Sequence, residues 1–169
     1  NTTDYLFGIL KKARIRSENA TLYANLDGKF AILSFDKSKG PISTNMHDDF
    51  VVAGGILKSY DGVSLTEYGF HLYPENVTAV KNLGGSFADG TYLVQVIYEW
   101  TDNRGIKYQS APSISQSVTT SGTDNQILVT IPTLRMTDKG GTSASDVNIK
   151  VFVSEDGGTI MYLAATLAN

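Results

Sequence analysis

Two histidines come closest, among the side chains of this sequence, to metal or acid–base chemistry. His47 lies in the loop-like stretch MHDD, and an imidazole beside carboxylates is typical of a metal-ligand set. No second histidine lies at helical or hairpin spacing from it, so we interpret His47 as a solvated loop residue. His71, between Phe70 and Leu72 at a predicted strand end, is interpreted as a capping or packing residue.

Acidic turns are the second set of candidates, because carboxylate and amide oxygens are the ligands that calcium prefers. The set contains Asp36, Asp48 and Asp49, then Asp102 with Asn103, and then Asp124 with Asn125. None has the D-x-D-x-D-G spacing that supplies six or more oxygens to one ion. Asp and Asn also favour tight turns, and turn formation explains each group better than metal binding does.

Motifs for nucleophilic or nucleotide chemistry are missing from the sequence. It contains no G-x-S-x-G elbow, no phosphate-binding P-loop and no G-x-G-x-x-G after a strand. The chain has no cysteine, which excludes thiolate zinc sites and disulfides. A carboxylate pair for glycoside hydrolysis stays open, because the fold sets such pairs. We predict that the protein is not an enzyme and has no catalytic, cofactor-binding or metal residues.

The element that organises the chain is a predicted hairpin within residues 89–113. Its first strand alternates with a period of two, which predicts one buried face and one half-covered face. Residues 101–105 supply turn chemistry, residues 106–110 return as a second strand, and Pro112 ends that strand. The face predicted to be buried consists of Tyr92, Val94, Val96, Tyr98 and Trp100.

Seven short strands are predicted after Pro74, each bounded by a cluster of turn residues. This number of strands in about 95 residues is typical of an immunoglobulin-like sandwich, which we predict for residues 74–169. The predicted strands are Val77–Lys81, Thr91–Trp100, Ile106–Ser110, Ile114–Thr119, Gln126–Ile131, Val147–Ser154 and Thr159–Ala165.

Residues 1–73 are predicted to form a smaller segment rich in β-hairpins. Asp27-Gly28 and Asp61-Gly62 each predict a tight turn between two apolar runs. Residues 50–60 are predicted to form one strand, in which Gly54-Gly55 indicates a bulge or a close backbone approach. The predicted loop covers residues 37–49, and residues 5–15 are a strand or an arm, with a helix possible over 9–14. A segment of this size buries little surface, so we expect it to lean on the sandwich, a neighbouring copy or further chain.

The charge balance gives no reason to expect a nucleic-acid partner, with 17 acidic against 14 basic residues. One basic cluster is present, Lys11, Lys12, Arg14 and Arg16, which we interpret as a solvated strand face or a subunit contact. No apolar run approaches the roughly 20 residues of a membrane helix. The chain begins with Asn, which indicates a processed product or a fragment. Most of its nine tyrosines alternate along strands, so we assign them to packing.

One family is similar over residues 74–165. The pieces GTYLVQVIYEWTDNRGIKYQSAPS, QILVTIPTL and VNIKVFVSEDGGTIMYLA resemble the fibronectin type III or Ig-like modules of bacteriophage tail proteins. The upstream piece VVAGGILKSYDGVSLTEYGFHLYPENV is similar to strand-turn-strand blades of tail nozzle or tubular proteins. Family members have Tyr-Arg-Thr where this chain has Phe152-Val153-Ser154. The resemblance implies a virion structural role and carries over no catalytic residue.

The leading hypothesis is therefore a phage tail component that acts by assembling into a homo-oligomeric ring with its own copies and neighbouring virion proteins. Candidate contact elements are Asp27-Gly28, Asp61-Gly62 and the loop 138–145, which we expect to be exposed. The alternative is a module that binds a host-surface glycan or protein through exposed aromatics and the loop 100–105. A third hypothesis is an accessory domain that positions a larger hydrolase.

Overall fold

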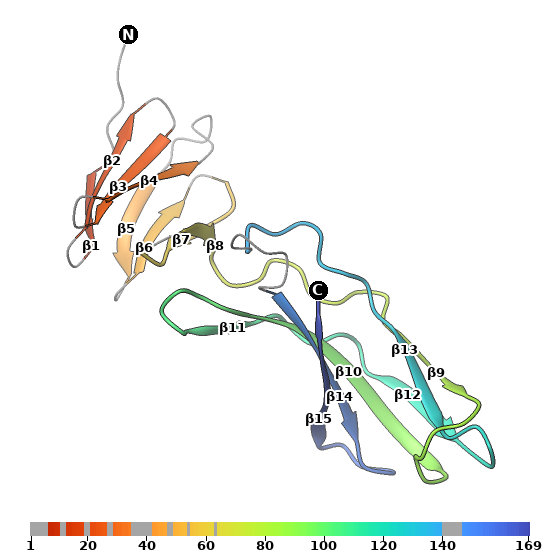
Figure 1. Ribbon diagram of the computed structural model, residues 1–169. Coiled ribbons are helices and arrows are strands. Elements are labelled where there is room, and N and C mark those ends of the chain that lie inside the picture. The colour runs from red at the N-terminus through yellow and green to blue at the C-terminus, as the bar shows by residue number, and fades with distance from the viewer. Residues whose placement is uncertain are drawn as a thin grey trace. The chain divides into compact units, whose positions relative to one another are not determined.

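A computed structural model describes residues 7–10, 13–18, 21–26, 29–34, 42–46, 49–53, 55–62, 64–139 and 147–169. Over these residues the protein is all-β, with fifteen strands and no helix, so the predicted fold class is confirmed (Figure 1). No helix long and apolar enough to cross a membrane occurs in these ranges. By its contacts the chain divides into two units, residues 1–68 with 102–106, and residues 69–101 with 107–169. The predicted boundary was Pro74.

The first sheet of unit 1 has four antiparallel strands in sequence order: β1 (Phe7–Leu10), β2 (Ala13–Glu18), β3 (Thr21–Leu26) and β4 (Lys29–Ser34). Leu26 pairs with Lys29, so β3 and β4 form the predicted hairpin; its turn residues Asp27 and Gly28 lie outside the described ranges. Residues 9–10 and 13–14 belong to two paired strands and not to a helix, because each strand completes its hydrogen bonds with its neighbour.

The second sheet of unit 1 corrects two predictions. Its strands are β5 (Ile42–Met46), β6 (Asp49–Ala53), β7 (Lys58–Tyr60) and β8 (Leu65–Glu67). The predicted loop 37–49 was wrong over 42–46, where β5 pairs with β6. The predicted bulge was also wrong: Phe50 lies opposite Tyr60, so the chain reverses between β6 and β7. Gly55 makes this reversal possible at a φ of 119°, a conformation that a side chain would oppose.

Unit 2 contains all seven strands predicted after Pro74, with ends shifted by a few residues. A two-stranded sheet pairs β9 with β13, and a larger sheet has the order β11-β10-β14-β15, with β12 also paired to β10. The strands are β9 (Thr78–Asn82), β10 (Gly90–Thr101), β11 (Lys107–Gln109), β12 (Gln116–Thr120), β13 (Gln126–Thr130), β14 (Val147–Ser154) and β15 (Met161–Ala168).

The core of unit 2 lies along β10, and the predicted alternation is confirmed. Every predicted inward residue from Tyr92 to Trp100 is buried, while Leu93, Gln95 and Ile97 on the other face are half-buried. The buried face packs with Val118, Leu134 and the alternating residues of β14. The Tyr98 hydroxyl donates to the Pro132 carbonyl at 2.7 Å, and burial raises the pKa of this phenol. The ring is therefore buried without leaving its polar end unsatisfied.

Two serines complete the edge of β10 where its neighbouring segment leaves strand geometry. The amides of Tyr98 and Val96 donate to the Oγ atoms of Ser110 and Ser113, each at 3.0 Å. The amides of these serines donate back to the Tyr98 and Val96 carbonyls, each at 2.9 Å. The serine Oγ atoms therefore accept from β10 amides in the place of strand carbonyls. Pro112 lies between the serines and has no N–H, so it cannot donate a ladder bond to β10. This explains why β11 ends before Pro112, as predicted.

Candidate functional site

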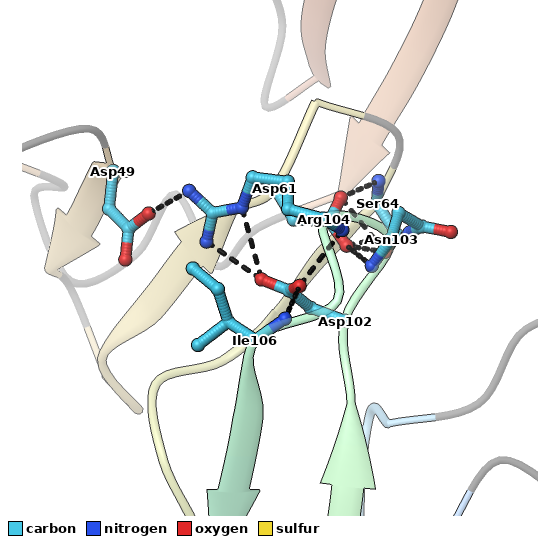
Figure 2. A network of polar contacts seen from close by, with 7 residues as sticks. All are labelled: Asp49, Asp61, Ser64, Asp102, Asn103, Arg104 and Ile106. Carbon is cyan, nitrogen blue, oxygen red and sulfur yellow. Dashed lines mark hydrogen bonds and ion pairs between the residues drawn. The ribbon is translucent and has the colours of Figure 1, made fainter.

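The tip of the β10–β11 hairpin, residues 102–106, belongs to unit 1 and carries a network of polar contacts (Figure 2). The buried Asp102 carboxylate accepts from the backbone amides of Arg104 at 2.9 Å and Ile106 at 2.8 Å. It also accepts from Arg104 Nε at 3.0 Å and from an Arg104 terminal nitrogen at 2.8 Å. One carboxylate thus fixes both the turn and its arginine, as expected of Asp at the start of a tight turn.

Arg104 is held by carboxylates of two strand ends. Its guanidinium lies between Asp102 and Asp49, the first residue of β6, and is hydrogen-bonded and ion-paired to both. Burial by itself lowers the pKa of Arg104, but the hydrogen bonds and charges of Asp49 and Asp102 more than offset it and raise the pKa. The cation is therefore permanent, and it serves to neutralise two acids rather than to exchange protons.

Asp61 corrects the prediction that Asp61-Gly62 projects as a contact tip. The residue is only 6% exposed. Its carboxylate accepts from the Ser64 amide at 2.8 Å, and from the amide and side-chain nitrogens of Asn103 at 3.2 and 2.6 Å. Burial, and then the charge of Asp61, raise the pKa of Tyr60, whose hydroxyl donates to the Gly62 carbonyl at 2.7 Å. The sequence correctly predicted the turn at Asp61-Gly62, but the Asp61 side chain hydrogen-bonds within unit 1 and does not project from it.

In the part of the chain that the structure describes, no group of three or more His, Cys, Asp or Glu residues is arranged to hold a metal ion. The oxygens of Asp102 and Asp61 are occupied by amide and guanidinium donors. In the loop 100–105, which the alternative hypothesis used for glycan contact, Trp100 is buried. Asn103 and Arg104 hold these carboxylates, although residues 103–105 are exposed.

A second charged cluster lies on the outer face of the larger sheet of unit 2. Glu99 is buried and accepts from Lys150 Nζ and Gln109 Nε2, each at 2.8 Å, with Lys107 Nζ at 4.0 Å. Burial tends to raise the pKa of Glu99, but these hydrogen bonds and the two lysine charges lower it below its ordinary value of 4.5. The cross-strand position of Gln109, directly opposite Glu99, makes the cluster a feature of the β10–β11 pairing.

We expect the lowered pKa of Glu99 to contribute to the loss of stability of unit 2 in acid. Because its pKa is lower in the folded than in the unfolded chain, the ionised side chain stabilises the fold above pH 4.5. This contribution is lost as the pH falls through the lowered folded pKa. We expect Glu99→Gln to cost about 1.5–3 kcal/mol at pH 7 and to flatten the stability loss below about pH 5. Urea titrations at several pH values measure this, and parallel pH profiles for both proteins would contradict it.

Lys139 is a buried cation, although we expected the loop 138–145, to which it belongs, to be exposed. Its Nζ lies 4.8 Å from the Phe70 ring centre and 5.3 Å from that of Trp100. Both rings belong to unit 2, so the lysine closes one end of its core with cation–π contacts. Residues 140–145 of the predicted contact loop lie outside the described ranges.

β15 is the last strand of the larger sheet and presents an apolar edge. It pairs with β14 on one side, and no described strand pairs with its other side. Its sequence MYLAATLA contains neither charge nor proline, and Tyr162, Leu163 and Leu167 are each about half exposed. The register shifts opposite Val151 and Phe152, which leaves Ala164 as the extra residue of a bulge. A row of free backbone groups thus lies beside exposed apolar side chains.

A groove of about 530 Å³ lies beside the segment that enters β9. Its walls come from residues 73–78 and from Ile114 and Gln116 at the start of β12. Tyr73 and Ile114 provide exposed apolar surface. Neither residue was a predicted site residue. The sequence offered one signal, the number of tyrosines that could form a binding face, but we assigned most tyrosines to packing instead.

The remaining predicted candidates do not converge. His71 is exposed, so its predicted packing role was wrong, and His47 lies outside the described ranges. Asp124 makes an ion pair with Lys81 at 3.4 Å, as a turn residue would. Tyr60, Tyr92 and Tyr98 are buried in cores, as packing required, whereas other tyrosines are well exposed: Tyr68, Tyr73 and Tyr162.

Three comparisons with known proteins were made for the whole chain. No protein-family model, no curated protein and no solved structure matches the chain.

Proposed function

We propose that this chain is a structural subunit of a larger particle, a bacteriophage tail component, and that it acts by assembling with its own copies and neighbouring virion proteins. Its location would be the virion, and its assembled form a homo-oligomeric ring. The resemblance of residues 74–165 to Ig-like tail modules supports the virion part of the proposal. The observation that supports the assembly part is the β15 edge.

The β15 edge supports assembly because soluble monomers normally protect such edges. Lysine, proline and short strands are the usual devices, since an open strand recruits other strands. β15 has eight residues and none of these devices; its one irregularity is the bulge at Ala164. A strand of a neighbouring subunit would satisfy its backbone groups and cover Leu163 and Leu167. In a ring each subunit offers one patch to a different patch of the next.

A charge on this edge is expected to dissociate the assembly. Leu163→Lys places an ammonium in the contact, so we expect the oligomer seen by sedimentation velocity to weaken at least tenfold in its dissociation constant. Leu128→Lys is the matched control, because Leu128 on β13 is 50% exposed and Leu163 52%. The control should assemble like the unmodified chain, and circular dichroism should show both variants folded.

Two results would count against this proposal. The unmodified chain could sediment as a monomer up to several hundred micromolar, which would contradict the proposal that the chain assembles with its own copies. Alternatively, the oligomers of both lysine variants could dissociate equally, which would contradict the assignment of β15 as the contact. Negative-stain images of closed rings would support the homo-oligomeric form directly.

The alternative function, a receptor-binding module, was assigned two kinds of contact, the loop 100–105 and exposed aromatics. In the loop, Asn103 and Arg104 hold carboxylates, whereas Tyr68, Tyr73 and Tyr162 are exposed. The groove at Tyr73 offers a different place for ligand binding.

A further inference from the structure

We infer that the groove at Tyr73 binds a neutral saccharide. This inference concerns unit 2 alone and does not depend on assembly through β15. The groove has a volume of about 530 Å³, within the range of sites for small ligands. The side chains that decide its chemistry are those of Tyr73, Glu75, Asn76, Thr78, Ile114 and Gln116.

The segment forming one wall is anchored at two points and holds its other side chains outward. Pro74 is fully buried and Val77 is 5% exposed, whereas Tyr73, Glu75 and Asn76 are exposed. Asn76 adopts a φ of 56° and is the one described non-glycine residue with positive φ. Such conformations are uncommon and gather at functional positions. The two anchors and the sharp turn therefore fix the groove before a ligand arrives.

The polar groups of the groove are free to bind. Within the described ranges, the side chains of Tyr73, Glu75, Asn76 and Thr78 make no hydrogen bond to the protein. Gln116 uses only its amide nitrogen, in a long 3.4 Å contact with the Ile114 carbonyl. Amides and hydroxyls both donate and accept, and Glu75 accepts. Sugar hydroxyls, which also do both, are suited to this mixture.

The apolar and charged groups narrow the ligand class further. The Tyr73 ring offers an apolar face on which the C–H side of a sugar ring can stack, and Ile114 extends that surface. No lysine or arginine lines the groove, and its one charged residue is an acid. Phosphorylated and acidic ligands are therefore disfavoured, and a neutral saccharide satisfies both the polar and the apolar lining.

Titration of the full chain with free sugars tests the inference. Maltotriose, cellotriose and chitotriose serve as neutral probes, and 3′-sialyllactose as the acidic probe, with binding followed by amide NMR shifts. We expect at least one neutral probe to bind and to shift resonances of residues 73–78. Tyr73→Ala should weaken that binding about tenfold, whereas Tyr73→Phe, which keeps the ring, should weaken it only about twofold.

Two further variants separate binding from folding. Asn76→Gly keeps the positive φ but removes the amide, so it should weaken binding while the melting temperature stays unchanged. Tyr68→Ala is the matched control, because Tyr68 is 37% exposed and Tyr73 39%, and it should bind normally. Binding of none of the neutral probes, preference for the acidic one, or binding indifferent to Tyr73→Ala and Asn76→Gly would each overturn the inference. Assembly measured on the same samples reports separately on β15.

Discussion

Replacing Val96 with aspartate is expected to prevent unit 2 from folding. Val96 lies at the centre of β10, is 0% exposed, and packs in the core shared with β14. A carboxylate there has no described cation to pair with and must either remain buried and charged or take up a proton. Both cost several kcal/mol, which is a large part of the stability of a domain this size. We expect a loss above about 4 kcal/mol.

Trp100 provides the measurement, since it is the only tryptophan of the chain and is buried in the same core. Its fluorescence should shift to the red in Val96→Asp, and Val96→Ala should stay folded with a loss of about 2 kcal/mol in urea. Val80→Asp is the matched control, because Val80 on β9 is 53% exposed. It should cost under about 1 kcal/mol. Equal losses at positions 96 and 80 would contradict the assigned core.

Removing the Asp102 carboxylate is expected to open the hairpin tip. Asp102→Ala leaves two backbone amides without their acceptor and removes the Asp102 counter-charge of Arg104. Breaking a buried pair by removing one partner costs more than the pair contributes, so we expect a loss of about 3–5 kcal/mol in local stability. Asp102→Asn keeps one acceptor oxygen but no charge, so its loss of stability should lie between that of the unmodified chain and that of Asp102→Ala.

Hydrogen exchange of peptides that cover residues 58–67 and 102–106 measures this loss locally, so it does not require the two units to unfold together. Asp124→Ala is the control: its ion pair with Lys81 has a 3.4 Å separation and exposed partners, and surface pairs contribute about 0–1 kcal/mol. Exchange in Asp102→Ala no faster than in Asp124→Ala would show that the network does not stabilise the tip.

Local patterns in the sequence were sufficient for the strands of unit 2 and for its core, whereas β5 was missed. The alternation from Tyr92 to Trp100 predicted which face is buried, because successive side chains of a strand point to opposite sides. Asp-Gly pairs predicted the β3–β4 and β7–β8 hairpins. The failures came where one residue type serves two purposes: Gly54-Gly55 fits a bulge and a chain reversal equally, and only the pairing of Phe50 with Tyr60 distinguishes them.

The sequence by itself determined an all-β chain, without cysteine chemistry and with a buried β10, since period and turn chemistry are local properties. Tertiary structure alone decided which side chains are in use. Asp61 looked like an exposed turn acid, yet it is buried and accepts from Asn103, which is 42 residues away in the sequence. Asp102 accepts within its own turn, but the arginine that it holds also reaches Asp49 on β6. The β15 edge and the Tyr73 groove also arise from strand order and from segments far apart in the chain, which no local pattern encodes.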